Sequence, residues 1–543
     1  MKKMKTKRSF STTLKFLALA CFAVFLLYFP GCDITDPAEG IKAIMNTKER
    51  TTTVAVILRD AATNEPVGFD NNNKVRVTIE GKDKDKVIDL VNRKKTEFES
   101  VKGFISFAFL DDVVPDINNP LEIIIIAEAD GFITTSLPLT ITIPENNPVE
   151  IMMVNTSSPP EGVVGEVNQP IGSTSSTGHA TSDIQFGTGR DPITNTRASF
   201  FIRNDTRITT STGNPLQGQL RATYHLFNSR SPESLQSFPG GFSVQADDSP
   251  NGEDRVFFTT GGFTSIQITD QAGNRAVNFD PPIQVGIELD QQVRDHNNNP
   301  VNSGDMVPIW SYDETSGSWT FERNAPIRDG GSGNLEVQFE ASHLSWWNID
   351  WFSNACYEGT RVNLLGNNSQ LRGRLIRADN MTLLGWMASR YLYDSANFIQ
   401  FIWAPRGIPG ILELYNMSEE LLATVELPNL CSTTPVDVNL QSSTEITVTF
   451  RGTGLCPDKV EDVQIRPNFP AFYKPASSGV WLSAGNVVNG EIQITFPAPG
   501  MYNFGAYYEN EWYQFSLDLS NAQDGDVYDE TFDLPQVICD EIK

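Results

Sequence analysis

Thr53-Val54-Ala55-Val56-Ile57-Leu58 opens the stretch of sequence that decides the fold. This apolar run ends in a polar turn at residues 60–65, and a second run follows in which Val75, Val77 and Ile79 share one face. Successive side chains of a β-strand point to opposite faces, so this spacing is typical of a strand with one buried side. The stretch therefore predicts two strands joined by a turn.

The same pattern continues through the rest of the chain. Short apolar alternations recur between turns rich in Gly, Pro, Asn, Asp, Ser and Thr, and no long segment shows a convincing 3.6-residue period. With 543 residues, the chain is too long for one hydrophobic core. The sequence predicts an all-β protein made of tandem β-sandwich modules.

Residues 1–31 have the features of a signal peptide. Basic residues precede an apolar run at residues 16–29, and Gly31-Cys32 follows it. This end resembles a bacterial lipobox, although Phe29 and Pro30 depart from the usual Leu and Ala or Ser. The resemblance implies that Cys32 carries a lipid and that residues 32–50 form a lipidated tether. An ordinary secretory signal with a chance cysteine is the alternative.

This leader predicts a lipid-anchored protein of the cell envelope, at the outer membrane and either surface-exposed or periplasmic. We expect the chain to contact the membrane through the N-terminal lipid. The longest later apolar stretch, residues 123–127, has the length of a strand and is too short to span a bilayer.

Residues 51–155 form the first expected module. Four features follow one another along this segment: Pro66-Val67, a strand ending at Gly81, Lys102-Gly103-Phe104, and a strand leading to Gly131-Phe132. This order resembles that of the carboxypeptidase regulatory-like, or transthyretin-like, β-sandwich. The resemblance covers about a hundred residues and implies a seven-stranded sandwich without catalytic residues. Residues 156–182, rich in Ser, Thr, Pro and Gly, are expected to be a linker.

Residues 183–352 form a large β module. It ends in an alternating strand at 335–340 and in Ser342-His343-Leu344-Ser345-Trp346-Trp347-Asn348, which resembles the extracellular modules of cartilage intermediate layer protein. That resemblance implies a structural or adhesive context. Residues 353–435 form a further β-sandwich that resembles, in its rhythm, a second regulatory-like module. Residues 436–543 form an immunoglobulin-like β-sandwich, in which Tyr502 is the candidate for a tyrosine that bonds back to the backbone.

Charge and cysteine usage limit the possible partners. The net charge is −26, and removal of the basic leader makes the remaining chain more acidic, so nucleic acid is not an expected partner. Four cysteines follow Cys32, and an even number in an exported chain suggests two disulfides. Three connectivities are possible; the sequential one pairs Cys356 with Cys431 and Cys456 with Cys539, one bridge in each C-terminal module.

Catalytic and metal-binding patterns are weak. The four histidines, His179, His225, His296 and His343, stand in no nucleophile motif, and His343 is expected to be a polar cap over the neighbouring tryptophans. Residues 295–299 have the oxygen spacing of a calcium loop, but Pro300 stands where that loop needs a glycine, so a turn is favoured. We therefore expect no catalytic residue, no metal and no cofactor.

Two aromatic clusters are the best candidates for a functional surface: Trp346, Trp347 and Trp351, and Tyr507, Tyr508, Trp512 and Tyr513. Exposed rings could bind a glycan or a partner protein. Packing in the core or between modules is the favoured alternative. Trp346 and Trp347 must point to opposite faces of a strand, so we expect one ring in the core and the other covered by the neighbouring module, with the segment forming the contact between the second and third modules.

The resulting hypothesis is a non-enzymatic cell-surface lipoprotein with a structural, adhesive or protein-binding role. The alternative is a glycan-binding accessory protein of a polysaccharide-uptake system, and a cryptic hydrolase comes third.

Overall fold

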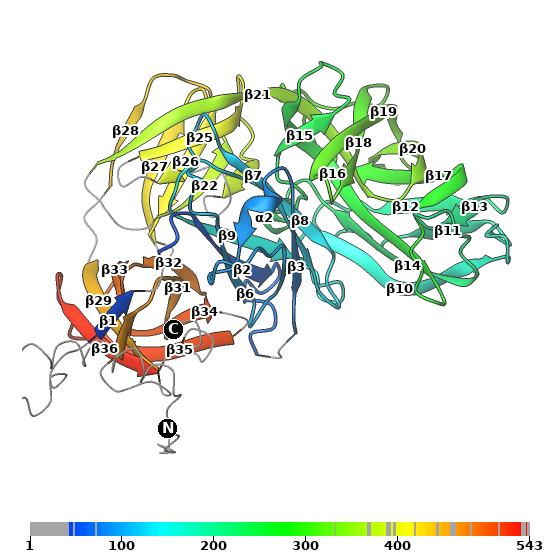
Figure 1. Ribbon diagram of the computed structural model, residues 1–543. Coiled ribbons are helices and arrows are strands. Elements are labelled where there is room, and N and C mark those ends of the chain that lie inside the picture. Colours follow the sequence, from blue (N-terminus) through cyan, green and yellow to red (C-terminus); the bar gives the residue numbers. More distant parts are fainter. Residues whose placement is uncertain are drawn as a thin grey trace, which may run out of the picture.

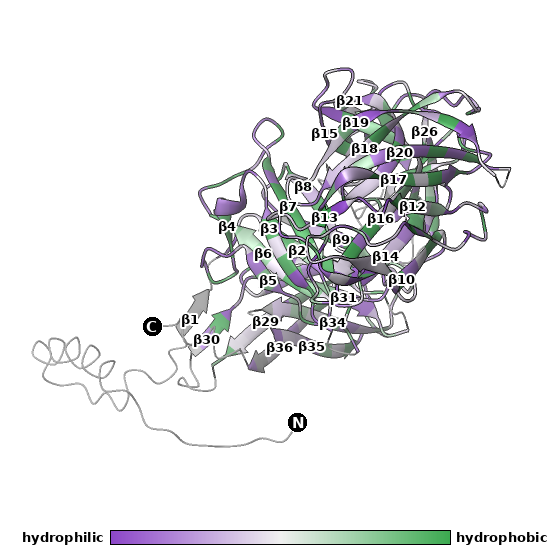
Figure 2. Cartoon of the chain, turned by 90° about the vertical axis from the view of Figure 1, so that its right-hand side faces the viewer, coloured by the Kyte–Doolittle hydropathy of each residue, from purple (hydrophilic) through white to green (hydrophobic). Residues whose placement is uncertain are grey.

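The computed structural model is almost entirely β, which confirms the expected fold class. It describes residues 43–46, 49–70, 73–331, 333–365, 371–386, 393–394, 398–416, 420–440, 445–456, 463–477, 480–508, 511–533 and 539. The signal peptide, Cys32 and most of the expected tether lie outside these residues. Figure 2 shows that hydrophobic and hydrophilic residues both occur along the strands. None of the described helices is long and apolar enough to span a membrane.

The first module is a sandwich of two four-stranded sheets. Their strands are β4 (Val87–Ile88), β6 (Phe104–Phe109), β2 (Thr53–Asp60) and β9 (Asn146–Met153) in one sheet, and β5 (Glu97–Glu99), β3 (Arg76–Glu80), β7 (Leu121–Glu128) and β8 (Thr135–Ile141) in the other. A 3-10 helix, η1 (Lys84–Lys86), precedes β4. The alternating side chains Val75, Val77 and Ile79 are fully buried in the core, as the sequence pattern predicts. The regulatory-like resemblance implies seven strands, whereas the two sheets contain eight.

The second unit is a larger sandwich. One sheet contains β10 (Val163–Thr174), β14 (Gly218–Phe227), β16 (Arg255–Asp270), β21 (Trp346–Leu365), β18 (Met306–Asp313) and β19 (Ser318–Asp329), joined by β15 (Ser243–Asp247). The other continues from β19 through β20 (Leu335–His343), β17 (Asn278–Leu289), β12 (Ala198–Ile202) and β11 (Ile184–Gly187), with β13 (Arg207–Thr209) paired to β17. A short helix, α2 (Pro232–Gln236), belongs to the second unit and lies against the third module.

Strand β21 belongs to two units. Its first half pairs with β16 and β18, and its second half pairs with β25 (Phe398–Pro405) and β28 (Val436–Asn439) of the third module. The remaining strands there are β24 (Tyr393–Asp394), β22 (Arg372–Arg377), β23 (Leu383–Trp386), β26 (Gly410–Tyr415) and β27 (Leu421–Leu427). Figure 1 shows β21 crossing from the green second unit to the yellow third module. The expected boundary at residue 352 is therefore wrong, because it falls inside one continuous strand.

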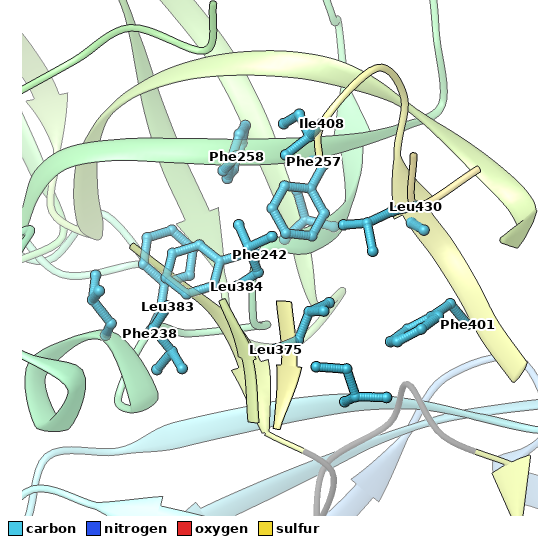
Figure 3. Close-up of a cluster of buried hydrophobic side chains, with 14 of the residues drawn as sticks. Phe238, Phe242, Phe257, Phe258, Leu375, Leu383, Leu384, Phe401, Ile408 and Leu430 are labelled. Carbon is cyan, nitrogen blue, oxygen red and sulfur yellow. The ribbon is translucent and has the colours of Figure 1, made fainter. Parts of the chain in front are cut away.

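One hydrophobic core joins the second unit to the third module. Figure 3 shows this cluster, in which phenylalanines of the second unit face leucines of the third. The labelled residues are Phe238, Phe242, Phe257 and Phe258 from the second unit and Leu375, Leu383, Leu384, Phe401, Ile408 and Leu430 from the third. Since both sides bury their apolar surface in the same cluster, the two units share a core and do not simply touch.

The last module is also a sandwich of two sheets. One contains β30 (Val463–Arg466), β29 (Ile446–Leu455), β33 (Glu491–Phe496) and β36 (Val527–Asp533), and the other contains β32 (Leu482–Val487), β31 (Phe469–Pro475), β34 (Met501–Tyr508) and β35 (Glu511–Asp518). The Tyr502 hydroxyl donates a hydrogen bond to the carbonyl oxygen of Ala498 at 2.6 Å, which confirms the backbone contact expected for this residue.

Two expected connectors are parts of sheets. Strand β1 (Ala43–Asn46), in the expected tether, pairs in parallel with β30 at the edge of the last module. Strand β10 lies in the expected linker 156–182 and pairs with β14 of the second unit. The interpretation of these segments as free tether and free linker is therefore wrong for residues 43–46 and 163–174.

Both disulfides have the sequential pairing. Cys356 bonds to Cys431 within the third module, and Cys456 bonds to Cys539 within the last module. The second bridge also packs against Ile88 and Ala108 of the first module, so it contributes to the surface between two modules.

Candidate functional site

The tryptophans at the start of β21 are buried on opposite faces. Trp346 lies in the core shared with the third module, where its ring centroid is 5.3 Å from that of Phe227. Trp347 lies in the core between the two sheets of the second unit, 5.1 Å from the ring centroid of Phe339. Trp351 is buried in that same core. The ring contacts of Trp346 come from its own unit, and none of these three rings offers an open platform.

The C-terminal aromatic cluster packs against the first module. Trp512 stacks on Phe104 with ring centroids 4.1 Å apart, and Tyr507 is buried in the core of the first module. Phe472 and Trp481, also from the last module, enter the same core. The side chain of Tyr508 lies outside the described residues. Tyr507 and Trp512 therefore hold two modules together.

A buried ion-pair cluster joins three modules. Glu150 of the first module accepts hydrogen bonds from Arg59 at 2.6 Å and from Arg372 of the third module at 3.1 Å. Arg59, which is fully buried, also donates to the carbonyl oxygen of Trp481 in the last module. Burial acts to raise the pKa of Glu150, but the two guanidinium groups outweigh it, so the pKa lies below its ordinary value.

A cavity of about 950 Å³ opens beside this cluster. It is lined by the first, third and last modules, including Leu139, Arg361, Phe398, Gln400 and Asn486. The Arg361 guanidinium lies 3.7 Å from the centroid of the Phe398 ring. A volume of this size falls at the upper end of the range of roughly 300–1,000 Å³ found for ligand sites. The cavity is therefore the candidate binding site of the chain.

A second cavity, of about 530 Å³, lies between the first module, the third module and the α2 segment of the second unit. Glu150 and Arg372 line both cavities, so their ion pair stands where the two cavities meet. A change in this pair would alter both at once.

Ser311, Glu322 and His343 come together on the second unit. The Ser311 hydroxyl donates to Glu322 at 2.6 Å, and His343 Nε2 lies 3.7 Å from the same carboxylate oxygen. A hydrolase triad places the histidine between the nucleophile and the acid, so that the imidazole takes the proton of the nucleophile. Here the carboxylate stands in the middle, and the arrangement does not activate Ser311. The imidazole of His343 lies 5.1 Å from the Trp347 ring, as expected for a polar cap.

The Asp295–Asn299 segment is a turn that satisfies its own oxygens. One carboxylate oxygen of Asp295 accepts hydrogen bonds from the backbone N–H groups of Asn297 and Asn299, and the other accepts one from the Asn299 side chain. Within the described part of the chain, no group of three or more His, Cys, Asp or Glu residues is placed to hold a metal ion.

Sequence reasoning did not identify Arg59, Glu150 and Arg372. A signal was present, because Arg59 follows the apolar run of β2 and Glu150 stands between Val149 and Ile151. A charge inside an apolar strand needs a partner when it is buried. The partner cannot be found from the sequence, because Arg372 is separated from Glu150 by 222 positions.

The comparisons with known proteins give no family. No family model matches the chain, and no curated protein matches it. The resemblances to the carboxypeptidase regulatory-like domain and to cartilage intermediate layer protein therefore stay predictions.

Several solved structures show a distant likeness. The TIE protein of Bacillus anthracis is 8% identical, with 84% of this chain and 68% of that chain covered and a TM-score of 0.14. A streptococcal ancillary pilin is 10% identical, with 43% and 94% covered and a TM-score of 0.12. The minor pilin GBS52 of Streptococcus agalactiae is 7% identical, with 32% and 97% covered and a TM-score of 0.13. TM-scores this low establish no common arrangement of modules, so the function is argued from this chain's own residues.

Proposed function

We infer that this chain is an exported, lipid-anchored protein of the cell surface with a non-enzymatic structural, adhesive or protein-binding role. The pair of disulfides carries the export in this proposal, because such bonds form and persist in oxidising compartments outside the cytosol. The partners that fit are the membrane, through a lipid on Cys32, and a surface protein or glycan. The acidic chain repels nucleic acid.

A fixed arrangement of modules suits this role. The second unit and third module share a core, and the first module is tied to the last by the Phe104–Trp512 stack and to the third by the Glu150–Arg372 ion pair. The first module also contacts the second unit, where the hydroxyls of Ser136 and Tyr312 are hydrogen-bonded at 2.7 Å. A body held in this way presents its surface in a constant shape, which lowers the entropic cost of binding a partner.

The experiment for the anchor uses Cys32→Ala, with Cys21→Ala as the matched control inside the leader. Metabolic acyl labelling and detergent partitioning should show lipid on the wild type and on Cys21→Ala, but none on Cys32→Ala. Protease treatment of intact cells then separates surface exposure from a periplasmic location. If Cys32→Ala is labelled like the wild type, the anchor proposal fails.

Glycan binding is the second candidate function, and the 950 Å³ cavity is the observation that favours it. The cavity offers the Phe398 ring, the amides of Gln400 and Asn486, and charged groups, which is the mixture that sugar recognition uses. A glycan array with the folded chain should be repeated with Phe398→Ala and with Phe515→Ala, an exposed phenylalanine outside the cavity. Binding that is lost only in Phe398→Ala supports this role, and no binding by the wild type removes it.

A further inference from the structure

Strands β16 and β21 enclose a polar cluster inside the shared core. Asn348 and Asp350 are fully buried and Thr260 is 8% exposed. Thr260 lies directly opposite Asp350 in the register of the two strands, and its hydroxyl lies 2.9 Å from Oδ1 of Asn348. Three polar side chains therefore meet in a place where polar groups are costly to bury.

The hydrogen bonding of this cluster is incomplete. Within the described residues, neither carboxyl oxygen of Asp350 has a hydrogen-bond partner, and Nδ2 of Asn348 has none. Buried polar groups are normally paired, and an unpaired one calls for an explanation such as a chemical role. The cluster combines a hydroxyl, a carboxamide and an acid, which are the parts needed for an acyl-transfer reaction.

The surroundings keep the acid neutral and exclude water. The aromatic rings of Phe258, Trp310 and Phe352 pack together on these strands, and the indole N–H of Trp310 donates to the backbone carbonyl of Asp350. Burial raises the pKa of Asp350 well above its ordinary value, and the Thr260 hydroxyl opposes this only in part. A neutral carboxyl group can accept a proton on one oxygen and donate from the other.

The backbone orients the nucleophile. A bulge between Thr260 and Gly262 interrupts the pairing with β21, and the N–H of Gly262 donates to the Thr260 hydroxyl oxygen at 3.0 Å. That contact fixes the oxygen and leaves its proton free to turn between Asn348, whose Oδ1 lies 2.9 Å away, and Asp350, which lies directly opposite in the strand register.

We propose that Thr260 and Asn348 become joined by an intramolecular ester bond, formed with the help of Asp350. The Thr260 oxygen attacks the side-chain carbonyl carbon of Asn348, and a new C–O bond forms. The hydroxyl proton passes to one oxygen of Asp350, whose other oxygen gives its proton to the amide nitrogen. The C–N bond breaks and ammonia leaves. The carboxyl group ends as it began, and no oxidant or further reactant is needed.

The product would link two strands across 88 positions of the chain and remove the unpaired amide from the core. Water exclusion by the aromatic rings would protect the ester from hydrolysis.

The test is peptide mapping of the full folded chain. After reduction and alkylation, trypsin releases Thr260 in the peptide 256–275 and Asn348 in the peptide 329–361. The expected result is one linked species whose mass is the sum of the two peptides less about 17 Da, the mass of the released ammonia. Hydroxylamine should separate the two peptides, because it cleaves esters.

Variants assign the roles. Thr260→Val and Asp350→Asn keep the shape of the side chains and should abolish the linked species, whereas Thr260→Ser should retain it. Thr264→Val, which changes a buried threonine on the same strand, is the control and should also retain it. Circular dichroism shows that each variant is folded. Free peptides in the wild type overturn the proposal. So does loss of ammonia in peptide 329–361 without a link, or a link that survives in Thr260→Val or Asp350→Asn.

Discussion

The indole ring of Trp512 in the last module lies stacked on the phenyl ring of Phe104 in the first, with 20° between the ring planes. The two residues are far apart in the chain and belong to different sandwiches. The same Phe104 ring is 4.8 Å from Phe472 and 5.7 Å from Trp481, measured between ring centroids. This aromatic group makes the contact between the first and last modules part of a hydrophobic core.

Trp512→Ala should therefore destabilise the protein. Truncation of a large aromatic in a packed core typically costs about 3–5 kcal/mol, and Trp512 is only partly buried, so we expect a loss of about 3 kcal/mol in the free energy of unfolding. Urea denaturation measures it. Phe515→Ala on the same strand is the control, because Phe515 is 52% exposed and should lose much less. Equal losses for the two variants would contradict the interface.

Glu150→Gln should weaken the junction of three modules. Removing one partner of a buried ion pair typically costs about 3–5 kcal/mol, because it leaves the other charge without compensation. The exposed pair of Arg451 and Glu491 is the matched control, and Glu491→Gln should cost about 0–1 kcal/mol. Chemical denaturation at neutral pH compares the two variants.

Glu150→Gln should also change how the stability of the protein depends on pH in acid. The pKa of Glu150 is lowered in the folded chain, so its stabilising contribution is present above the unfolded value of 4.5 and is lost as the pH falls through the folded pKa. Glu150→Gln should flatten the loss of stability below about pH 4.5. An unchanged acid slope in the variant would mean that the ion pair does not contribute.

His225 should make the stability of the protein depend on pH in a second, higher pH range. Its imidazole is buried opposite Gly165, and burial lowers its pKa from 6.5, with partial compensation from the Thr156 carbonyl. Below pH 6.5 the unfolded chain takes up a proton that the folded chain does not, so stability falls with decreasing pH. His225→Gln should reduce this slope, and His179→Gln, at an exposed turn, should keep it. Melting temperatures from pH 7.5 down to about pH 5 test this.

Both disulfides should stabilise the chain. They close loops of 75 and 83 residues, for which the chain-entropy account gives about 4.5 kcal/mol each. Non-reducing peptide mapping should find Cys356 with Cys431 and Cys456 with Cys539, and melting after reduction should occur at a lower temperature. Free thiols at all four positions in exported protein would be the opposite result.

Local features of the fold were predictable from the sequence. Alternation in β3 identified a strand because β3 buries one face, whereas β2 was identified as a short apolar run and is buried on both faces. Tyr502 was identified because its corner contact reaches only four residues back. The sequential disulfides followed from an even cysteine count and from one pair falling in each C-terminal module.

Contacts between distant segments were not predictable. Strand β10 reads as a linker because it is mostly half-exposed, and its two register shifts break the two-residue period. The six residues that open β21 are all buried, so they give no alternation that would mark where one unit ends. The candidate site depends on the contact of Arg372 with Glu150 and on the contact of Trp512 with Phe104. No local sequence pattern predicts either contact.

The pairing of β1 with β30 has a consequence for shortened versions of this chain. A chain that begins at residue 51 keeps every residue that the structure describes as part of a hydrophobic core but lacks β1, so β30 becomes the outermost strand of its sheet. Its unpaired N–H and C=O groups then form a template for another strand. Such a chain should self-associate by exchange of strands, and a short peptide with the sequence of residues 43–46 and their neighbours should compete with that association.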